Sequence, residues 1–344
     1  MLLARLMSRS APRCSLARTA RAAIALAAVG LLATACDGLG ISSASSAGAS
    51  GAVSVGVLQG ADDSPLYVGM QNGTFSKHGV QVSVIAYRTV NAEFAALQAG
   101  RIQVAEGDYA NYLSAQAQGK ASLRLIADGY DAAPNMIEIL AVPGSGITSP
   151  QSLVDKVVAA PPGQLISQDG NAPYSIEMAA AQSVLSSDGV SPTSVRWQPT
   201  PLSSMITALR LHRVDAILVP EPYIFQAESQ LGAAEVLDAC SGVTAGIPLS
   251  GYFSLASYTR QKAGVLASFQ AALATAQSRA GLRGPVTSVL PRSAGMSEQD
   301  AALVTLGSYP TFLNVGQDQR TAQMIYEAGI TESPVNVRSL AFRH

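Results

Sequence analysis

Cysteine and histidine are both scarce in this sequence. The 344 residues include three of each, and the cysteines stand at positions 14, 36 and 240. Disulfide frameworks and cysteine-ligated metal sites need several cysteines at short spacings, which this chain lacks. His78, His212 and His344 lie far apart in the sequence, so we interpret them as surface or packing residues. We therefore expect neither a metal nor a cofactor.

Charged residues are also sparse, and the basic ones are not clustered in the folded part. Asp, Glu, Lys and Arg make up 13% of the chain, with a net charge of −1. Five arginines precede Asp37 and no acidic residue does, so the remainder carries a net charge of −6. A mildly acidic chain without a basic patch is not typical of a nucleic-acid-binding protein.

The apolar stretch near the N-terminus is too short for a permanent membrane span. Residues 22–35 would form a helix of about 21 Å, against a hydrocarbon core of ~30 Å. The stretch follows a basic leader, as in a secretory signal peptide. The leader contains Arg5, Arg9, Arg13, Arg18 and Arg21.

The signal-like stretch ends in "LLATACDG". Small residues Thr34 and Ala35 precede Cys36, which resembles a bacterial lipoprotein cleavage box, although Ala33 stands where leucine is preferred. We predict a lipoprotein signal peptide over residues 1–35, lipidation of Cys36 and anchoring outside the cytoplasm on the cell membrane. The alternative is ordinary secretory cleavage nearby. Residues 36–52, rich in Ser, Ala and Gly, are then a flexible tether of about 20–24 Å.

About 290 residues follow the tether, more than one hydrophobic core usually holds. Short apolar runs alternate with helical segments, which predicts βαβ units and parallel strands. Expected strands include residues 53–58, 80–88, 102–105, 123–127, 157–160, 194–199 and 216–219. Residues 136–143 read as a crossing between lobes and 234–240 as a return strand. The predicted fold is α/β with two lobes, each a mostly parallel sheet flanked by helices, joined by two hinge crossings. Lobe one takes residues 53–139 plus 243–344, and lobe two takes 140–242.

Two stretches share one pattern. "ALQAGRIQVAEGDYANYL" (residues 96–113) and "ALRLHRVDAILVPEPYI" (208–224) each read as helix, turn, short strand, then acid and tyrosine. Gly100 has His212 as its counterpart. The repetition predicts equivalent elements in the two lobes, each ending at the mouth of a shared cleft.

Five segments in order resemble the solute-binding proteins of ABC importers. In chain order they are "LYVGMQNGTFSKHGVQVSVI", "ALQAGRIQVA", "PGSGITSPQSLVDKVVAA", "ALRLHRVDAILVPEPY" and "GYFSLASYTRQKAGVLASFQAALATA". Gln103 replaces the usual Asp, and Ser152 and Asp155 replace Asp and Gly. The branch is the one that groups sulfonate, nitrate, taurine and thiamine-pyrimidine binders. The resemblance implies a type II periplasmic-binding fold, a monomer without catalysis, hinge closure on a small solute, and delivery to a permease powered by a cytoplasmic ATPase.

Ligands of open α/β sheets bind beyond the carboxyl ends of the strands. We therefore placed the site in the loops that follow the predicted strands. Tyrosines recur there, and their apolar rings and polar hydroxyls suit a flat or heterocyclic solute. The predicted ligand-binding residues are Asp62, Asp63, Arg88, Asn91, Glu106, Asp108, Tyr109, Asp128, Gln168, Asn171, Tyr174, Glu221, Tyr223 and Tyr252.

Acidic residues outnumber basic ones among these candidates. Unpaired carboxylates in a partly dry cleft disfavour a bound anion. The pattern favours an amine-bearing or neutral heteroaromatic solute, such as a thiamine-precursor pyrimidine, and an oxyanion of the sulfonate or nitrate type is the alternative. Each acid also has a structural interpretation. Asp108 can cap a helix, Asp62 or Asp63 can cap the helix that follows Pro65, and Glu221 can pair with Arg88 or Arg213.

Two other functions are compatible with this scaffold. A related branch makes thiamine pyrimidine with lysine-bound pyridoxal phosphate, a histidine and a cysteine-rich motif, but this chain has no cysteine cluster. A sensory or interaction lipoprotein would keep the fold without transport. Genes for a permease and an ATPase beside this one would argue against that alternative.

Overall fold

The computed structural model describes residues 51–164, 166 and 175–343. The predicted signal peptide, the lipidation site Cys36 and almost all of the tether lie outside the described residues. So do three of the predicted ligand-binding residues, Gln168, Asn171 and Tyr174.

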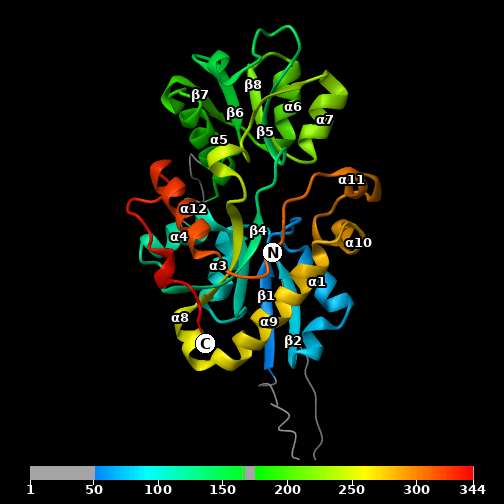
Figure 1. Ribbon diagram of the computed structural model, residues 1–344, viewed down its shortest axis with the longest axis vertical. Helices are drawn as coiled ribbons and strands as arrows, with labels where there is room; N and C mark the ends of the chain where they lie inside the picture. The colour runs from blue at the N-terminus through cyan, green and yellow to red at the C-terminus, as the bar shows by residue number, and fades with distance from the viewer. Residues whose placement is uncertain (1–50, 165, 167–174, 344) are drawn as a thin grey trace, which may run out of the picture. The chain divides into compact units, whose positions relative to one another are not determined.

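One sheet contains the first strands of the described chain. Its five strands run in the order β2-β1-β3-β10-β4. They are β1 (Gly51–Val57), β2 (Val80–Ala86), β3 (Val104–Asp108), β4 (Leu123–Asp131) and β10 (Pro248–Leu255). β1 is parallel to β2 and β3, whereas β10 is antiparallel to β3 and β4 (Figure 1).

The second sheet repeats this arrangement with strands β7-β6-β8-β5-β9. They are β5 (Ile137–Ala141), β6 (Val157–Ala160), β7 (Arg196–Pro199), β8 (Ala216–Pro220) and β9 (Ala234–Asp238). β5 is antiparallel to β8 and β9, in the place that β10 has in the first sheet. In each sheet the antiparallel strand is the first one after the chain crosses from the other sheet. The prediction of two mostly parallel sheets joined by two crossings is therefore confirmed. The predicted lobe boundary at residue 139 falls inside β5.

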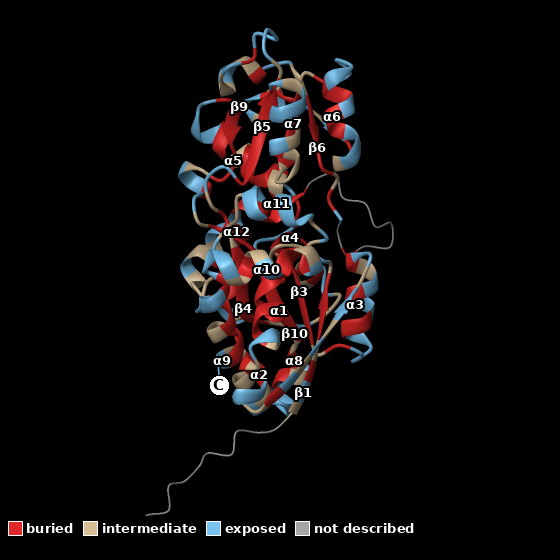
Figure 2. Cartoon of the chain, turned by 90° about the vertical axis from the view of Figure 1, so that its right-hand side faces the viewer, coloured by how far each residue is buried: buried red, intermediate tan, exposed pale blue. Residues whose placement is uncertain are grey.

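Helices cover both sheets. They are α1 (Ser64–Gln71), α2 (Thr74–Lys77), α3 (Val90–Gln98), α4 (Tyr109–Ala117), α5 (Ile176–Ser187), α6 (Leu202–Arg210), α7 (Tyr223–Leu231), α8 (Ala256–Gln261), α9 (Ala263–Ala280), α10 (Arg283–Ser293), α11 (Glu298–Leu303) and α12 (Val315–Glu327), with 3-10 turns η1 (Pro150–Leu153), η2 (Pro192–Ser194), η3 (Gly242–Thr244) and η4 (Val337–Ser339). α9 packs on α1, β1 and β2, and α12 contacts α4, α5 and β10. The inner strands β3, β5 and β10 are buried, and the outer helix faces are exposed (Figure 2). The edge strands β2 and β7 are largely exposed.

Some helix ends follow the sequence signals and others do not. Pro65 lies in the first turn of α1, and Gly100 has the left-handed φ of 69° that suits the end of α3. Asn91 does not cap α3, because Thr89 is extended there and its hydroxyl accepts a hydrogen bond from Ala92 N at 3.2 Å. Ser203 and Ser204 lie within α6, which begins after Pro201.

The repeated stretches end their helices in the same way. Gly100 N–H donates to Leu97 O at 3.0 Å and Arg101 N–H to Ala96 O at 2.9 Å. In the second stretch His212 N–H donates to Leu209 O at 3.1 Å and Arg213 N–H to Ala208 O at 3.0 Å. His212 also has a positive φ, 51°, although it has a Cβ. The two stretches are equivalent elements, as the sequence predicts.

The residue before each following strand makes a further equivalent contact. Gln103 Oε1 accepts a hydrogen bond from Ser54 N at 2.9 Å, and Asp215 Oδ2 accepts one from Val157 N at 2.8 Å. Each bond ties a helix–strand unit to the neighbouring parallel strand, β1 or β6. Gln103 thus makes the same kind of contact as the aspartate at the equivalent position.

Two strands extend further than the sequence predicted. We placed Glu106, Asp108 and Asp128 in loops, but β3 ends at Asp108 and β4 at Asp131. The reason is β10, which lies between them and pairs Tyr252 with Glu106, Ser250 with Asp108 and Gly251 with Asp128. Tyr252 is likewise inside a strand. A strand so distant in sequence leaves no local signal in β3 or β4.

Candidate functional site

Two carboxyl groups meet at the carboxyl ends of the first sheet's strands. Asp62 lies in the loop after β1 and is partly exposed, whereas Glu106 in β3 is only 2% exposed. The two carboxyl groups lie close enough for each to affect the pKa of the other.

Unpartnered polar groups surround this pair. Glu106 Oε1 and Ser250 Oγ are buried without a hydrogen-bond partner of normal geometry. Both lie over Gly129, where an added Cβ would stand 3.0 Å from Glu106 Oε1 and 2.6 Å from Ser250 Oγ. The hydroxyl of Tyr252, on the same strand as Ser250, is also buried and unpartnered.

Two further acids lie behind the pair. Asp63 immediately precedes α1, yet its side chain makes no capping bond and both of its oxygens are unpartnered. Glu93 of α3 accepts a hydrogen bond from the Tyr112 hydroxyl at 2.8 Å. We call Asp62, Asp63, Glu93 and Glu106, with the hydroxyls of Ser250 and Tyr252, the carboxyl cluster.

Burial sets the protonation of the carboxyl cluster. Burial, with a smaller contribution from the Asp62 carboxyl, raises the pKa of Asp63 to about 9 and of Glu93 to about 8. Burial also raises the pKa of Asp62, and it moves the pKa of Glu106 well above its usual range with help from the Asp62 charge. The empty cluster is therefore largely neutral near neutral pH, because proton uptake avoids the cost of several buried charges.

Asp108 connects this region to the second sheet. Its carboxylate caps α4 by accepting a hydrogen bond from Ala110 N at 2.5 Å. Burial raises the pKa of Asp108 to about 8, and the next contribution is the carboxylate of Glu177. Glu177 lies in the first turn of α5, beyond β6 of the second sheet. The Asp108 carboxyl at the end of β3 therefore lies within electrostatic range of Glu177 at the start of α5.

Asp128 and Tyr109 form a separate, structural network. The Tyr109 hydroxyl donates to Asp128 Oδ1 at 2.6 Å, and Asn314 N donates to Oδ2 at 3.1 Å. Asp318 of α12 adjoins Asp128, and burial raises the pKa of both acids. These contacts hold α4 and α12 against β4, and they use both oxygens of Asp128. Asp128 and Tyr109 were both predicted to bind ligand, but their polar groups make these structural hydrogen bonds instead.

The sequence of this chain matches a known protein family. The family model described as NMT1/THI5 like matches residues 61–280, more than half of the chain. The chain belongs to the NMT1/THI5-like family. Among curated proteins, none matches this sequence.

Solved structures resemble this NMT1/THI5-like chain at low identity. The periplasmic aliphatic sulphonate binding protein SsuA of Escherichia coli is 18% identical with a TM-score of 0.66, over 85% of this chain and 92% of that one. The nitrate-binding protein NrtA of Synechocystis PCC 6803 is 14% identical with a TM-score of 0.61, over 84% of each chain. The desulfurization enzyme DSZB is 14% identical with a TM-score of 0.63, over 84% and 96%. Together with the two sheets and two crossings, these similarities confirm the predicted type II periplasmic-binding fold.

The structure brings together only some of the predicted site residues. Asp62, Asp63, Glu106 and Tyr252 lie in the carboxyl cluster, and Asp108 lies beside it. Arg88 is exposed after β2, Asn91 is half-buried in α3, and Glu221 and Tyr223 lie on the second sheet at the start of α7.

Glu221 has a local partner instead of an arginine. Its carboxylate accepts a hydrogen bond from Phe225 N at 3.2 Å, in the first turn of α7. The predicted pairing with Arg88 or Arg213 is not recorded among the described residues. A carboxylate at a helix N-terminus is satisfied by free backbone N–H groups, so the arginine is not needed.

Sequence reasoning missed Glu93 and Ser250. Glu93 stands three residues after Val90 and four before Leu97, on the apolar face of a predicted helix. An acid on that face is a signal that the pattern contained. Ser250 gave no comparable signal, because only pairing with distant strands buries it.

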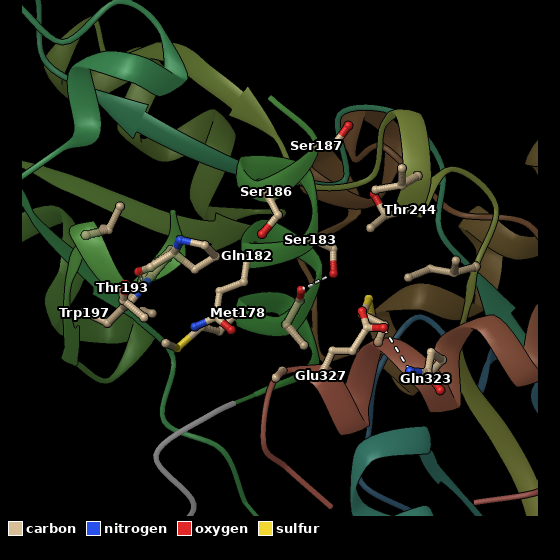
Figure 3. A pocket seen from close by; sticks show the side chains of 18 of the residues that line it. Met178, Gln182, Ser183, Ser186, Ser187, Thr193, Trp197, Thr244, Gln323 and Glu327 are labelled. Atoms are coloured by element: carbon tan, nitrogen blue, oxygen red, sulfur yellow. Dashed lines mark hydrogen bonds between the residues drawn. The ribbon is translucent and has the colours of Figure 1, made fainter. Parts of the chain in front are cut away.

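A groove of about 1070 Å³ lies elsewhere, along α5 (Figure 3). Met178 of α5 and Met324 of α12 line it, with Ile247 from the second crossing. Trp197 of β7 also lines it and is the only tryptophan of the chain. None of the predicted site residues that the structure describes lines this groove. We assign the site to the strand ends, because the buried unpartnered groups are there and the groove has a mostly exposed polar rim.

Two kinds of feature are absent from the described chain. Within residues 51–164 and 175–343, no three His, Cys, Asp or Glu side chains are arranged to hold a metal ion. Over the same residues, no helix combines the length and the apolarity needed to cross a bilayer.

Proposed function

We propose that this chain is a lipid-anchored extracytoplasmic solute-binding protein of an ABC importer. It captures a small polar or heteroaromatic solute between two lobes and delivers it to a permease coupled to a cytoplasmic ATPase. Residues 53–139 plus 243–344 form one lobe and 140–242 the other, and the protein acts as a monomer without catalysis. Family membership and the periplasmic-binding fold support this function.

One structural observation supports the proposal independently of family membership. Asp108 at the end of β3 lies close enough to Glu177 at the start of α5 for one carboxylate to raise the pKa of the other. Buried polar groups without partners lie beside this junction, at Glu106, Ser250 and Tyr252. Unsatisfied buried groups are costly, and a ligand that satisfies them recovers that cost on binding.

A sulfonate or nitrate receptor is the second candidate, because SsuA and NrtA are structural neighbours. Helix N-termini are the usual anion sites of such folds. Here, however, aspartates occupy the positions before both α1 and α4, at Asp63 and Asp108. The Asp108 carboxylate accepts a hydrogen bond from Ala110 N, where an anion would bind at the start of α4, and this argues for the first candidate.

Ligand screening tests the function. The purified chain without its leader is heated with pyrimidines, amines, amidines, sulfonates and nitrate, and the unfolding temperature is recorded. Small-angle scattering then measures closure of the lobes with any stabilising compound. We expect stabilisation and a smaller radius of gyration for one chemical class. A well-folded protein that no class stabilises would contradict the transport role.

Anchoring needs its own experiment. Wild-type protein expressed in bacteria should partition with membranes, and Cys36→Ala should release it into the soluble extracytoplasmic fraction. Retention of the variant on membranes would contradict lipidation at Cys36.

A further inference from the structure

We propose that the groove along α5 is a second binding site, separate from the carboxyl cluster, and that it takes a small aromatic carboxylate. Its volume is about 1070 Å³, close to the upper end of the range of about 300–1,000 Å³ that is usual for small-molecule sites. None of the residues of the carboxyl cluster, all of which the structure describes, lines the groove. The groove therefore offers a ligand a place that the proposed solute does not use.

Three elements form most of the wall of the groove. They are α5 on the second sheet, α12 on the first, and the crossing between β9 and β10 (residues 239–247), which contributes Ile247. Figure 3 shows Met178 and Gln182 of α5 on one side of the groove and Gln323 and Glu327 of α12 on the other. A molecule in the groove therefore contacts helices of both sheets and a connection between them.

The buried part of the lining is apolar and contains two sulfur atoms. Met178, Ile247 and Met324 line the groove and are almost fully buried. Trp197 of β7 contributes the surface of its ring, because its indole N–H already donates to Pro192 O at 3.1 Å. Aromatic rings pack favourably against thioether sulfurs and against other rings. A flat aromatic group is therefore the best match for this surface.

Arg320 gives the groove a positive charge on the α12 side. Arg320, Met324 and Glu327 are spaced by four and three residues, so they share one face of this helix. One turn, about 5–6 Å between Cβ atoms, separates Arg320 from Met324. Among the residues that the structure describes, no hydrogen bond or ion pair holds the Arg320 guanidinium. Because a guanidinium binds a carboxylate through two parallel N–H···O bonds, a carboxylate beside the ring completes the match.

Glu327 lies on the same face of α12 and sets the direction of the ligand. It is seven residues from Arg320, about 10 Å along the helix axis. Its carboxylate accepts a hydrogen bond from Gln323 Nε2 at 2.9 Å. Salt screens the repulsion between exposed charges at such a separation. The two charges therefore favour one orientation, with the ligand's carboxylate at Arg320 and away from Glu327.

The crossing that lines the groove is bonded to α12 and to the other crossing. Gln317 Nε2 donates to Gly246 O at 2.9 Å, and Ala132 N, between β4 and β5, donates to Ile247 O at 2.8 Å. A ligand beside Ile247 should therefore restrain both connections between the sheets. A ligand that prefers one arrangement of the lobes shifts the population toward it, so the groove would also alter solute affinity. This effect rests on the proposed function, whereas binding in the groove does not.

Trp197 reports binding directly, because it lines the groove and is the only tryptophan of the chain. Four probes are titrated to about 10 mM, a level that reveals millimolar binding: 3-phenylpropionate, 3-phenylpropanol, 3-phenylpropylamine and propionate. We expect a saturable change in Trp197 emission with 3-phenylpropionate, and a Kd at least about fivefold lower than for the other three. Equal binding of the alcohol or the amine would overturn the inference, as would no saturable change with 3-phenylpropionate.

One variant locates the carboxylate. Arg320→Gln should weaken 3-phenylpropionate binding about fivefold or more and leave any binding of 3-phenylpropanol unchanged. Arg320 is exposed, so this variant should fold normally. Arg260→Gln removes the same charge from an exposed position of α8, outside the groove, and should change neither affinity. An unchanged affinity in Arg320→Gln, or an equal loss in Arg260→Gln, would contradict the assignment.

Hydrogen exchange then shows where the probe lies and whether it restrains the crossing. With 3-phenylpropionate near saturation, amide exchange should slow in residues 239–247 and in α12, and it should stay unchanged in β2 at the edge of the first sheet. Protection around Glu106 in place of the crossing would mean that the probe occupies the solute site. That result would overturn the assignment to the groove.

These tests separate the second site from the proposed function. If 3-phenylpropionate binds in the groove while no solute closes the lobes, the second site stands and the receptor function fails. If a solute closes the lobes while 3-phenylpropionate does not bind in the groove, the function stands and this inference fails.

Discussion

Tyr252 stands directly opposite Glu106 in the antiparallel ladder of β10 and β3. Opposed residues of such a ladder lie on the same face of the sheet, so the phenol and the carboxyl share one environment. Burial moves the pKa of the Tyr252 hydroxyl well above its usual range, and the Glu106 charge contributes. β10, which is distant from β3 in sequence, thus places a neutral hydroxyl in the carboxyl cluster.

The Tyr252 hydroxyl is expected to lower the stability of the ligand-free protein and to strengthen ligand binding. Tyr252→Phe removes a buried, unpartnered polar atom, so the ligand-free protein should gain roughly 1 kcal/mol of unfolding free energy. Affinity for the solute that ligand screening identifies should fall at the same time, because the hydroxyl lies in the carboxyl cluster. Urea unfolding and calorimetry measure the two effects. Tyr326→Phe, at an exposed position on α12, is the control and should change neither.

Stability should fall as the pH rises. Burial holds the folded-state pKa of Asp63 at about 9 and of Glu93 at about 8, above their ordinary values of 3.8 and 4.5. The native state then binds more protons than the unfolded state across this interval, so the unfolding free energy decreases with pH. The stabilising protonation is complete at low pH and is lost as the pH approaches the folded values.

Urea unfolding at pH about 5 and about 8 measures this slope. Asp63→Asn and Glu93→Gln should each flatten it and stabilise the protein at the higher pH by roughly 1 to 3 kcal/mol. A slope of the opposite sign in the wild type would contradict the buried, protonated state of these acids.

The two repeated helix ends predict opposite mutational effects. His212 is exposed and holds a positive φ of 51°, which costs a residue with a Cβ about 1 kcal/mol. His212→Gly should therefore stabilise the protein by up to roughly 1 kcal/mol. Gly100→Ala should destabilise it by a similar amount, because Gly100 has a φ of 69° and a Cβ there meets no other atom. Thermal unfolding of both variants tests the pair.

Trp197 offers a signal for lobe movement. It is the only tryptophan, and it lines the groove between α5 of the second sheet and α12, which packs on β10 of the first. Closure around a solute should change this groove and hence the emission of Trp197. We expect a spectral shift that saturates with the ligand. Trp197→Phe should lose the signal and keep the affinity measured by calorimetry.

The sequence predicted the arrangement better than the site. Alternating strand and helix patterns and the repeated stretches around Gly100 and His212 are local, and the two-sheet fold follows from them. The ends of β3 and β4 are set by β10, whose pairing no nearby residue encodes. The same pairing buries Glu106 and Tyr252 as strand residues, so neighbours in the site could not be derived from loop positions.

The individual acids show the same difference between local contacts and contacts with distant strands. Asp108 was predicted as a ligand residue or a helix cap, and the cap is observed because α4 begins immediately after it. Glu221 found a backbone donor in its own helix rather than an arginine. Both outcomes depend on contacts within four residues. The grouping of Asp62 with Glu106 and Tyr252 depends on the separate strands β1, β3 and β10, and only the folded structure displays it.

The place of β10 also has a consequence for the order of folding. The strands of the second sheet all lie within residues 137–238, whereas the first sheet needs residues 248–255 to fill the gap between β3 and β4. During synthesis β3 and β4 therefore keep unpaired edges until β10 is made. All strands of the second sheet can already pair by then. We expect the half of the protein that is made first to be finished last, and its carboxyl cluster to form only at that final step.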